Sequence, residues 1–127
     1  MSQYVDGNLR GFIADEAIAQ HLRVKLDSDG RVTVAGLTDR DIGTAETAAY
    51  AAGDPITVRL RTAAGTAKMV SIEALTVGSL VYTEANGKVQ DTAASTAFLI
   101  GTALESASGD GSVIEVLRYN HGDTAVT

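Results

Sequence analysis

The sequence predicts an all-β protein, a small β-barrel or β-sandwich built from two duplicated four-stranded units. The tetrapeptide Ile-Gly-Thr-Ala occurs at residues 42–45 and again at residues 100–103. A Gly-Asp turn and a strand-like segment follow each tetrapeptide. Apolar and polar residues also alternate with period two, which is typical of half-buried strands. These observations indicate an internal repeat over roughly residues 15–61 and 72–118.

A short strand precedes the first copy, which reads as two hairpins. Residues 11–14 are a candidate strand, and residues 22–26 and 31–34 alternate around the turn Asp29-Gly30. An Asp-Gly pair between alternating segments favours a hairpin. Residues 42–46 and 56–61 are the next two strands. Pro55 has no N–H to donate, so we expect it at a strand start or an edge.

The second copy repeats this pattern. A strand at residues 68–72 precedes the copy. Residues 80–83 and 88–90 then form a hairpin around Asn86-Gly87, and two strands close the copy at residues 98–104 and 113–118. One copy is too small to bury both faces of its strands, so we expect the copies to pack together. The glycine of each tetrapeptide then permits a bulge or close packing where the copies meet. Ile42 and Ile100 should be equivalent core residues.

The composition fits one domain and excludes several functions. The chain has 127 residues, of which 45% are hydrophobic, with two Phe, four Tyr and no Trp. We expect an N-terminal arm (residues 1–10), one β domain (11–118) and a C-terminal tail (119–127). Without Cys there is no disulfide and no zinc-thiolate site. A net charge of −6 disfavours nucleic-acid binding. No apolar run is long enough to cross a membrane, and the N-terminus does not resemble a signal peptide.

A search for catalytic or metal-binding patterns finds none that is specific. His21 and His121 have no partners at ligand spacing. Residues 27–30 (Asp-Ser-Asp-Gly) resemble the start of a calcium loop, but the required later Gly and Glu are missing. Arg59, Arg61 and Lys68 could form a basic face, which is either simply solvated or a contact for an acidic partner. We therefore expect no enzyme activity, no cofactor and no metal.

Several segments resemble the capsid cement, or head decoration, family of tailed bacteriophages. They are Val-Gly-Ser-Leu-Val-Tyr at residues 77–82, Asn-Gly-Lys-Val at 86–89, the tetrapeptide at 100–103 and the Ala-Ala-Gly-Asp-Pro-Ile-Thr-Val run at 51–58. The sequence departs from the family pattern at Ser79, where Asp is usual. Some members of this family are described as RecA/RadA-like recombinases, which no motif in this sequence supports.

The resemblance implies a non-catalytic protein that is made in the host cytoplasm and binds the outer surface of the assembled phage capsid. It would stabilise the capsid by bridging major capsid protein subunits, as a homotrimer, without contacting nucleic acid or membrane. Tyr4, Val5, Leu9 and Phe12 are apolar residues in a polar terminus, and we expect them to contact the capsid. Tyr50, in an Ala-rich loop, is the candidate subunit contact. The alternative is another virion surface module, either a head fibre base or a glycan-binding β domain.

Overall fold

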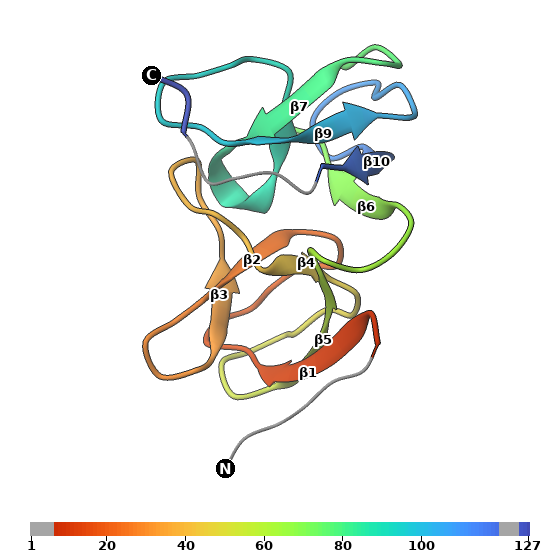
Figure 1. Cartoon of the computed structure of the whole chain (residues 1–127). Helices are drawn as coiled ribbons and strands as arrows, with labels where there is room; N and C mark the ends of the chain where they lie inside the picture. Colours follow the sequence, from red (N-terminus) through yellow and green to blue (C-terminus); the bar gives the residue numbers. More distant parts are fainter. Residues whose placement is uncertain (1–6, 120–124) are drawn as a thin grey trace.

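The computed structural model confirms the all-β fold and describes residues 7–119 and 125–127. In this part of the chain, ten strands form two five-stranded antiparallel sheets, one above the other in Figure 1. The one helical segment assigned there is a 3₁₀ turn at Ala85–Gly87. No helix among the described residues is long and apolar enough to cross a membrane.

The two sheets have the same strand order, which is the topology expected of an internal repeat. The first runs β1-β5-β4-β2-β3 and the second β6-β10-β9-β7-β8. The strands of the first sheet are β1 (Leu9–Ile13), β2 (Arg23–Leu26), β3 (Val32–Val34), β4 (Gly43–Ala45) and β5 (Pro55–Leu60). Those of the second are β6 (Ala67–Val70), β7 (Leu80–Thr83), β8 (Val89–Gln90), β9 (Leu99–Ala103) and β10 (Val113–Arg118).

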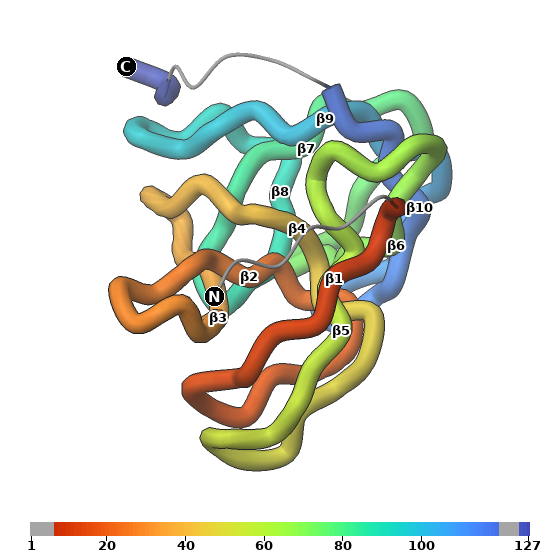
Figure 2. Tube along the Cα trace, turned by 60° about the horizontal axis from the view of Figure 1, so that its bottom comes forward, coloured from red at the N-terminus to blue at the C-terminus, as the bar shows by residue number. Residues whose placement is uncertain are grey.

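Each repeat has five strands, so the expectation of four was wrong by one. The additional strand is β1 in the first repeat and β6 in the second. β1 begins at Leu9, inside the segment expected to be an arm, and pairs with β5 from Leu9↔Arg59 to Ile13↔Pro55. Figure 2 shows these two strands side by side. Without β1, the N–H and C=O groups along one side of β5 would lack partners.

Each sheet closes on itself and encloses its own core, so the two repeats do not share one. Parallel bridges join Ala14 to Val32 and Ser71 to Val89, linking the first and last strands of each sheet. Closure of a sheet removes its exposed edges, and short strands can then surround a small core. The first core contains Ile18, Val24, Val32, Ile56 and Val58. The second contains Met69, Leu75, Val81, Ile100, Ile114 and Val116.

The glycine of each tetrapeptide lies where two strands of the same sheet approach closely. A Cβ on Gly43 would lie 2.0 Å from the Arg59 carbonyl oxygen, and one on Gly101 would lie 1.9 Å from that of Leu117. The expected close approach is therefore present, but it lies within each repeat and not where the repeats meet. Ile100 belongs to the second core, whereas Ile42 is half-buried and packs against the first core, so the two are not fully equivalent.

The repeats are joined by the turn at residues 84–88 of the second repeat. The Gly87 N–H donates to the Ala35 carbonyl at 2.8 Å. A Cβ on Gly87 would lie 3.0 Å from atoms of the first repeat, including the Arg23 carbonyl oxygen. The Arg23 side chain is fully buried and donates to the carbonyls of Glu84 (2.7 Å) and Lys88 (3.2 Å). The joint is thus polar, and buried hydrogen bonds fix it.

Candidate interaction surfaces

The residues predicted to contact the capsid are only partly described. Tyr4 and Val5 lie outside the described residues. Leu9 is 42% exposed on β1 and remains available to a partner. Phe12 is half-buried against the first core, and the Arg10 guanidinium lies 4.3 Å from its ring centroid. Much of the Phe12 side chain therefore supports the fold.

Tyr50 projects from the loop that leads to β5. Its side chain is 86% exposed. The loop backbone is nevertheless fixed, because the Asp54 carboxylate accepts hydrogen bonds from the N–H groups of Tyr50 and Ala51, both at 3.1 Å. A large aromatic side chain on an ordered loop can contact a partner without a large entropic cost.

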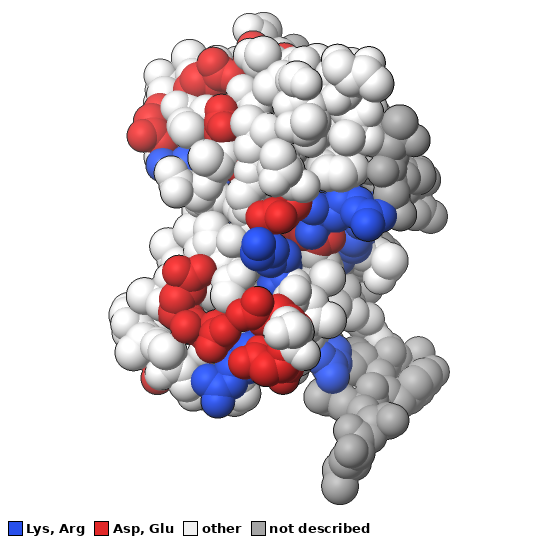
Figure 3. All heavy atoms as spheres, turned by 90° about the vertical axis from the view of Figure 1, so that its left-hand side faces the viewer, with Lys and Arg blue, Asp and Glu red and all other residues white. Residues whose placement is uncertain are grey.

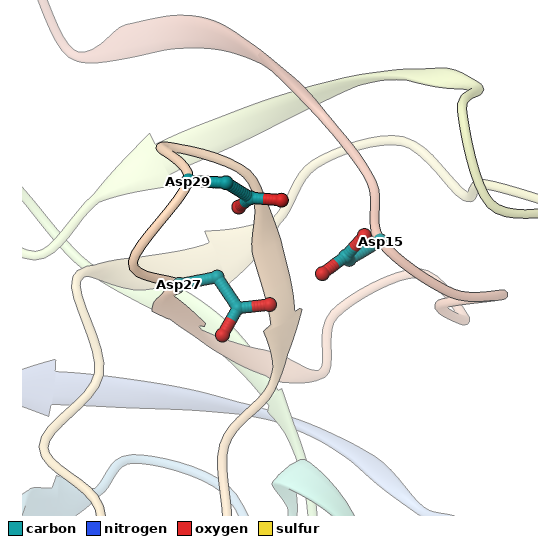
Figure 4. Close-up of side chains that lie close together, drawn as sticks. All are labelled: Asp15, Asp27 and Asp29. Carbon is teal, nitrogen blue, oxygen red and sulfur yellow. The ribbon is translucent and has the colours of Figure 1, made fainter.

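Three carboxylates gather at the tip of the first hairpin (Figure 4). Oxygens of Asp15, Asp27 and Asp29 lie within 4.8 Å of one another. Arg31 balances their charge in part, because its guanidinium lies 3.8 Å from the Asp15 carboxylate. The backbone N–H of Arg31 also donates a hydrogen bond to the Asp29 carboxylate at 3.0 Å. The hydrogen bond with Asp27 raises the pKa of Asp15. These contacts are turn chemistry, and they do not single out a metal.

His21 occupies a backbone conformation that favours glycine. Its φ is 72°, and Gly78, the corresponding residue of the second repeat, has φ 89°. The two residues make equivalent hydrogen bonds: the backbone N–H of His21 donates to the Ala45 carbonyl, and that of Gly78 donates to the Ala103 carbonyl. His21 lines a groove of about 480 Å³ together with Lys68. Burial lowers the pKa of His21, and the Lys68 charge adds to this effect. The other histidine, His121, lies outside the described residues.

A buried network of charges crosses from one repeat to the other. Asp41 lies 3.6 Å from the Arg23 guanidinium and 2.8 Å from that of Arg118. Burial lowers the pKa of Arg23, while the Asp41 charge opposes this effect. Because removing one member would leave another buried charge unpaired, we expect the network to fix how the repeats are oriented.

Arginines also line the hollows at the constriction between the repeats. Arg59, Arg61 and Arg118 all line a cavity of about 130 Å³ near the connection between β5 and β6. Of the basic face expected from the sequence, Arg59 and Arg61 come together here, while Lys68 and part of Arg59 line the His21 groove instead. Figure 3 shows charged side chains gathered at this constriction.

The outer surfaces of the two sheets differ at one row of paired residues. In the first repeat, Thr44 of β4 pairs with Arg23 and Arg59 on the strands either side. This row is largely buried: Arg23 is fully enclosed, and Thr44 is 2% exposed. The second repeat contacts it, both through the turn at residues 84–88 and through Thr66, whose carbonyl accepts from Arg59 at 3.2 Å.

The corresponding row of the second repeat is apolar and exposed. Thr102 of β9 pairs with Leu80 and Leu117 on the neighbouring strands. Leu80 is 45% exposed and Leu117 43%. Tyr119 extends the row, because its hydroxyl is hydrogen-bonded to that of Thr102. We call Leu80, Thr102, Leu117 and Tyr119 the apolar row. Figure 3 shows few charges on much of the upper repeat.

Sequence reasoning missed the apolar row, although a signal for it was present. Aligning the copies places Leu80 opposite Arg23 and Leu117 opposite Arg59. Two exchanges of Arg for Leu at outward-facing positions indicate that the same face has different surroundings in the two copies. Alternation alone could not show this, since it separates inner from outer faces and says nothing of what covers the outer one.

The fold is a two-repeat all-β module with an exposed apolar row on its second repeat. Residues 13–118 match the model of a family described as phage cement protein. The chain therefore belongs to the phage cement protein family, and it has a structural role in the phage capsid. This confirms the resemblance noted in the sequence.

A solved structure with a similar fold is the N base of the head fiber gp8.5 in bacteriophage phi29. The TM-score is 0.68 at 15% sequence identity, over 91% of this chain and 97% of that one. At this identity the likeness concerns the fold. None of the curated proteins matches the sequence.

Proposed function

We propose that this protein binds the outer surface of the assembled phage capsid and stabilises it by bridging neighbouring major capsid protein subunits, without catalysing a reaction. The observation that carries the proposal is the family match over residues 13–118. A protein that binds only the assembled shell stabilises it by mass action. Many copies on one shell add their effects even where each contact is weak.

The test is to add purified protein to expanded heads that lack it. We expect saturable binding and a rise in the temperature at which the heads fall apart. Binding that leaves the melting temperature unchanged would contradict stabilisation, and no binding at all would contradict the proposal as a whole.

For the capsid contact, we propose Tyr4, Val5, Leu9 and Phe12. Leu9 is exposed, and as β1 begins there, residues before it can be removed without cutting the strand. Deleting residues 2–7, which keeps the hydrogen bonds that Asn8 accepts from the Leu60 and Ala64 N–H groups, should weaken binding to heads, and Leu9→Ser should weaken it further. The melting temperature of the free protein serves as the control for folding. Unchanged occupancy of the heads by both variants would rule out this contact.

We also propose that the protein is a homotrimer in which copies meet through the apolar row and Tyr50. The support for the row is the comparison of the repeats: its counterpart in the first repeat is covered by protein. An exposed group of apolar side chains is typical of an interaction site. Repeated head-to-tail contacts between identical chains can close into a ring.

Mass measurement in solution tests this proposal. Leu117→Arg should shift the mass from trimer to monomer, and Tyr50→Ala should weaken the trimer. Val113→Arg is the matched control, because Val113 is 48% exposed on the same strand but lies outside the row. A wild-type protein that is monomeric at all concentrations, or a Leu117→Arg variant that remains trimeric, would contradict it.

The base of a head fibre is a second candidate role. It is favoured by the fold shared with the N base of the phi29 head fiber. A fibre base has to hold to the capsid but need not strengthen it. Saturable binding without any gain in head stability would therefore favour this role over cementing.

A further inference from the structure

The constriction between the repeats carries a concentration of arginine in a chain whose net charge is −6. Three neighbouring hollows there have Arg61 in common, with volumes of about 130, 10 and 490 Å³. The first is also lined by Arg59 and Arg118, the second by Arg118. We call Arg59, Arg61 and Arg118 the arginine waist.

The acidic groups beside the arginine waist are already engaged. Asp41 is 4% exposed and lies against both Arg23 and Arg118. Asp39 accepts from the Gly36 N–H at 2.8 Å and lies 3.1 Å from Lys25. None of the described residues that line the 130 Å³ cavity is Asp or Glu. Of the three arginines at this cavity, Arg118 has a carboxylate partner among the described residues, whereas Arg59 and Arg61 have none.

The arginines differ in how far their hydrogen-bonding capacity is used. Arg59 donates to the carbonyls of Thr66 (3.2 Å) and Ala64 (2.7 Å), which hold its guanidinium in place. Arg118 is held by Asp41. The Arg61 side chain makes no hydrogen bond or ion pair with any residue that the structure describes. Its backbone is fixed at the end of β5, since its N–H donates to Ile42 at 2.8 Å.

The chemistry of this site matches a carboxylate. A guanidinium presents a planar fork of N–H donors that binds a carboxylate through two parallel hydrogen bonds. The 130 Å³ cavity equals about four water molecules at liquid density, enough for a carboxylate group but small for a nucleotide. The open hollow of about 490 Å³ is lined by Lys25 and Arg61 and also by Asp39 and Asp41, which these cations partly balance, and it could take the next residues of an extended chain.

We propose that the arginine waist binds the carboxylate side chains of an acidic segment of the capsid partner, with Arg61 as the principal anchor. This inference rests on the proposed function. Because the chain has a net charge of −6, the protein as a whole repels an acidic partner segment, whereas the arginine waist attracts it. The waist would thus set the orientation in which the protein docks.

Binding to heads that lack the protein tests the inference, at about 50 mM and 300 mM salt, well below and well above physiological screening. We expect Arg61→Glu to weaken binding at least tenfold at low salt, and Arg61→Ala to weaken it less. Both should reduce the salt dependence. Arg31→Ala is the matched control, because it removes the same charge from an exposed hairpin. The melting temperature of each free variant should stay unchanged.

The outcomes separate the two proposals. If the wild-type protein does not bind heads, the proposed function fails. If it binds and Arg61→Glu binds equally well, the function stands and the arginine waist is ruled out as a contact.

A second measurement uses the free protein and N-acetylated hexaglutamate, followed by NMR at the Arg61 side-chain N–H. We expect a saturable shift at this group, and also at the backbone N–H of residue 61, where the shift should be lost in Arg61→Ala. No shift would overturn the inference. An equal shift with a short single-stranded DNA of the same charge would overturn the preference for carboxylates.

Discussion

The two repeats share a topology but differ in what covers their outer faces. Their sheets have the same strand order, the same closing bridge and the same close approach at a tetrapeptide glycine. The row containing Arg23 and Arg59 is covered by the second repeat, whereas the row containing Leu80 and Leu117 is exposed. Inward-facing residues and turns therefore specify the same fold in both repeats, while outward-facing residues distinguish the joint between the repeats from an exposed surface.

The largest expected effect on stability comes from the tetrapeptide glycines, which both repeats have in common. Gly101→Ala should lower the free energy of unfolding by at least about 4 kcal/mol, because the new Cβ would overlap the backbone of β10. Gly43→Ala should act alike in the first repeat. Urea denaturation measures both.

Gly11→Ala is the control for these variants, since no atom lies within 4 Å of a Cβ placed there. It should change stability by less than about 0.5 kcal/mol. If Gly43→Ala and Gly101→Ala differ widely, the two glycines do not play equivalent roles.

The next largest effect on stability is expected at a position where the repeats differ, which is Arg23 in the first repeat and Leu80 in the second. Arg23→Leu gives the first repeat the residue that the second has at Leu80. It should cost about 3–5 kcal/mol, because it leaves Asp41 with one partner fewer and removes hydrogen bonds across the joint. We expect thermal unfolding to separate into two transitions as the joint loosens. Leu80→Ala should cost less than about 1 kcal/mol, since Leu80 is half exposed. A single unchanged transition for Arg23→Leu would contradict the role of the joint.

A smaller effect concerns His21, which has a positive φ at a position where the second repeat has a glycine, Gly78. His21→Gly should stabilise the protein by about 0.5–1 kcal/mol, because relief of the left-handed backbone exceeds the entropic cost of glycine. The reciprocal Gly78→Ala should destabilise by a similar amount. Urea midpoints at neutral pH measure both, and equal effects of the same sign would contradict the explanation.

The same residue predicts a pH dependence. Burial holds the pKa of folded His21 below the value of 6.5 expected for the unfolded chain. The unfolded chain then binds the proton more readily, so wild type should lose stability as the pH falls through 6.5 towards the folded pKa. His21→Gly should lack this loss. Urea midpoints at pH 8 and pH 5 give the comparison, and identical slopes in the two proteins would rule it out.

The smallest effect concerns Asp39, whose pKa is lowered chiefly by the hydrogen bond from the Gly36 N–H and also by Lys25. The stability it contributes is present above the unfolded value of 3.8 and is lost as the pH falls through the folded pKa. Asp39→Asn should therefore cost less than about 1 kcal/mol at neutral pH, because the pair is partly exposed. Acid titration of both proteins measures the loss. A variant that unfolds with the same acid profile as wild type would contradict this account.

Much of the fold could be predicted from local patterns. Alternation located most strands, and the Asp29-Gly30 and Asn86-Gly87 turns both lie between paired strands. The sequence predicts that Leu9 and Arg10 belong to an arm, because no local pattern marks them as a strand. In the structure they are the start of β1, because they pair with β5. The contact surfaces were harder to predict: Arg23 and Leu80 look equally outward in the sequence, and only packing makes one buried and the other exposed.

The sequence by itself determined the β class and the duplication, because alternation and repeated segments are patterns along the chain. Only the tertiary structure decided that each copy closes around its own core, that the turn at residues 84–88 seals the first repeat, and that Arg61 and Arg118 meet at one constriction. These depend on contacts between residues far apart in the chain, whose partners no local pattern specifies.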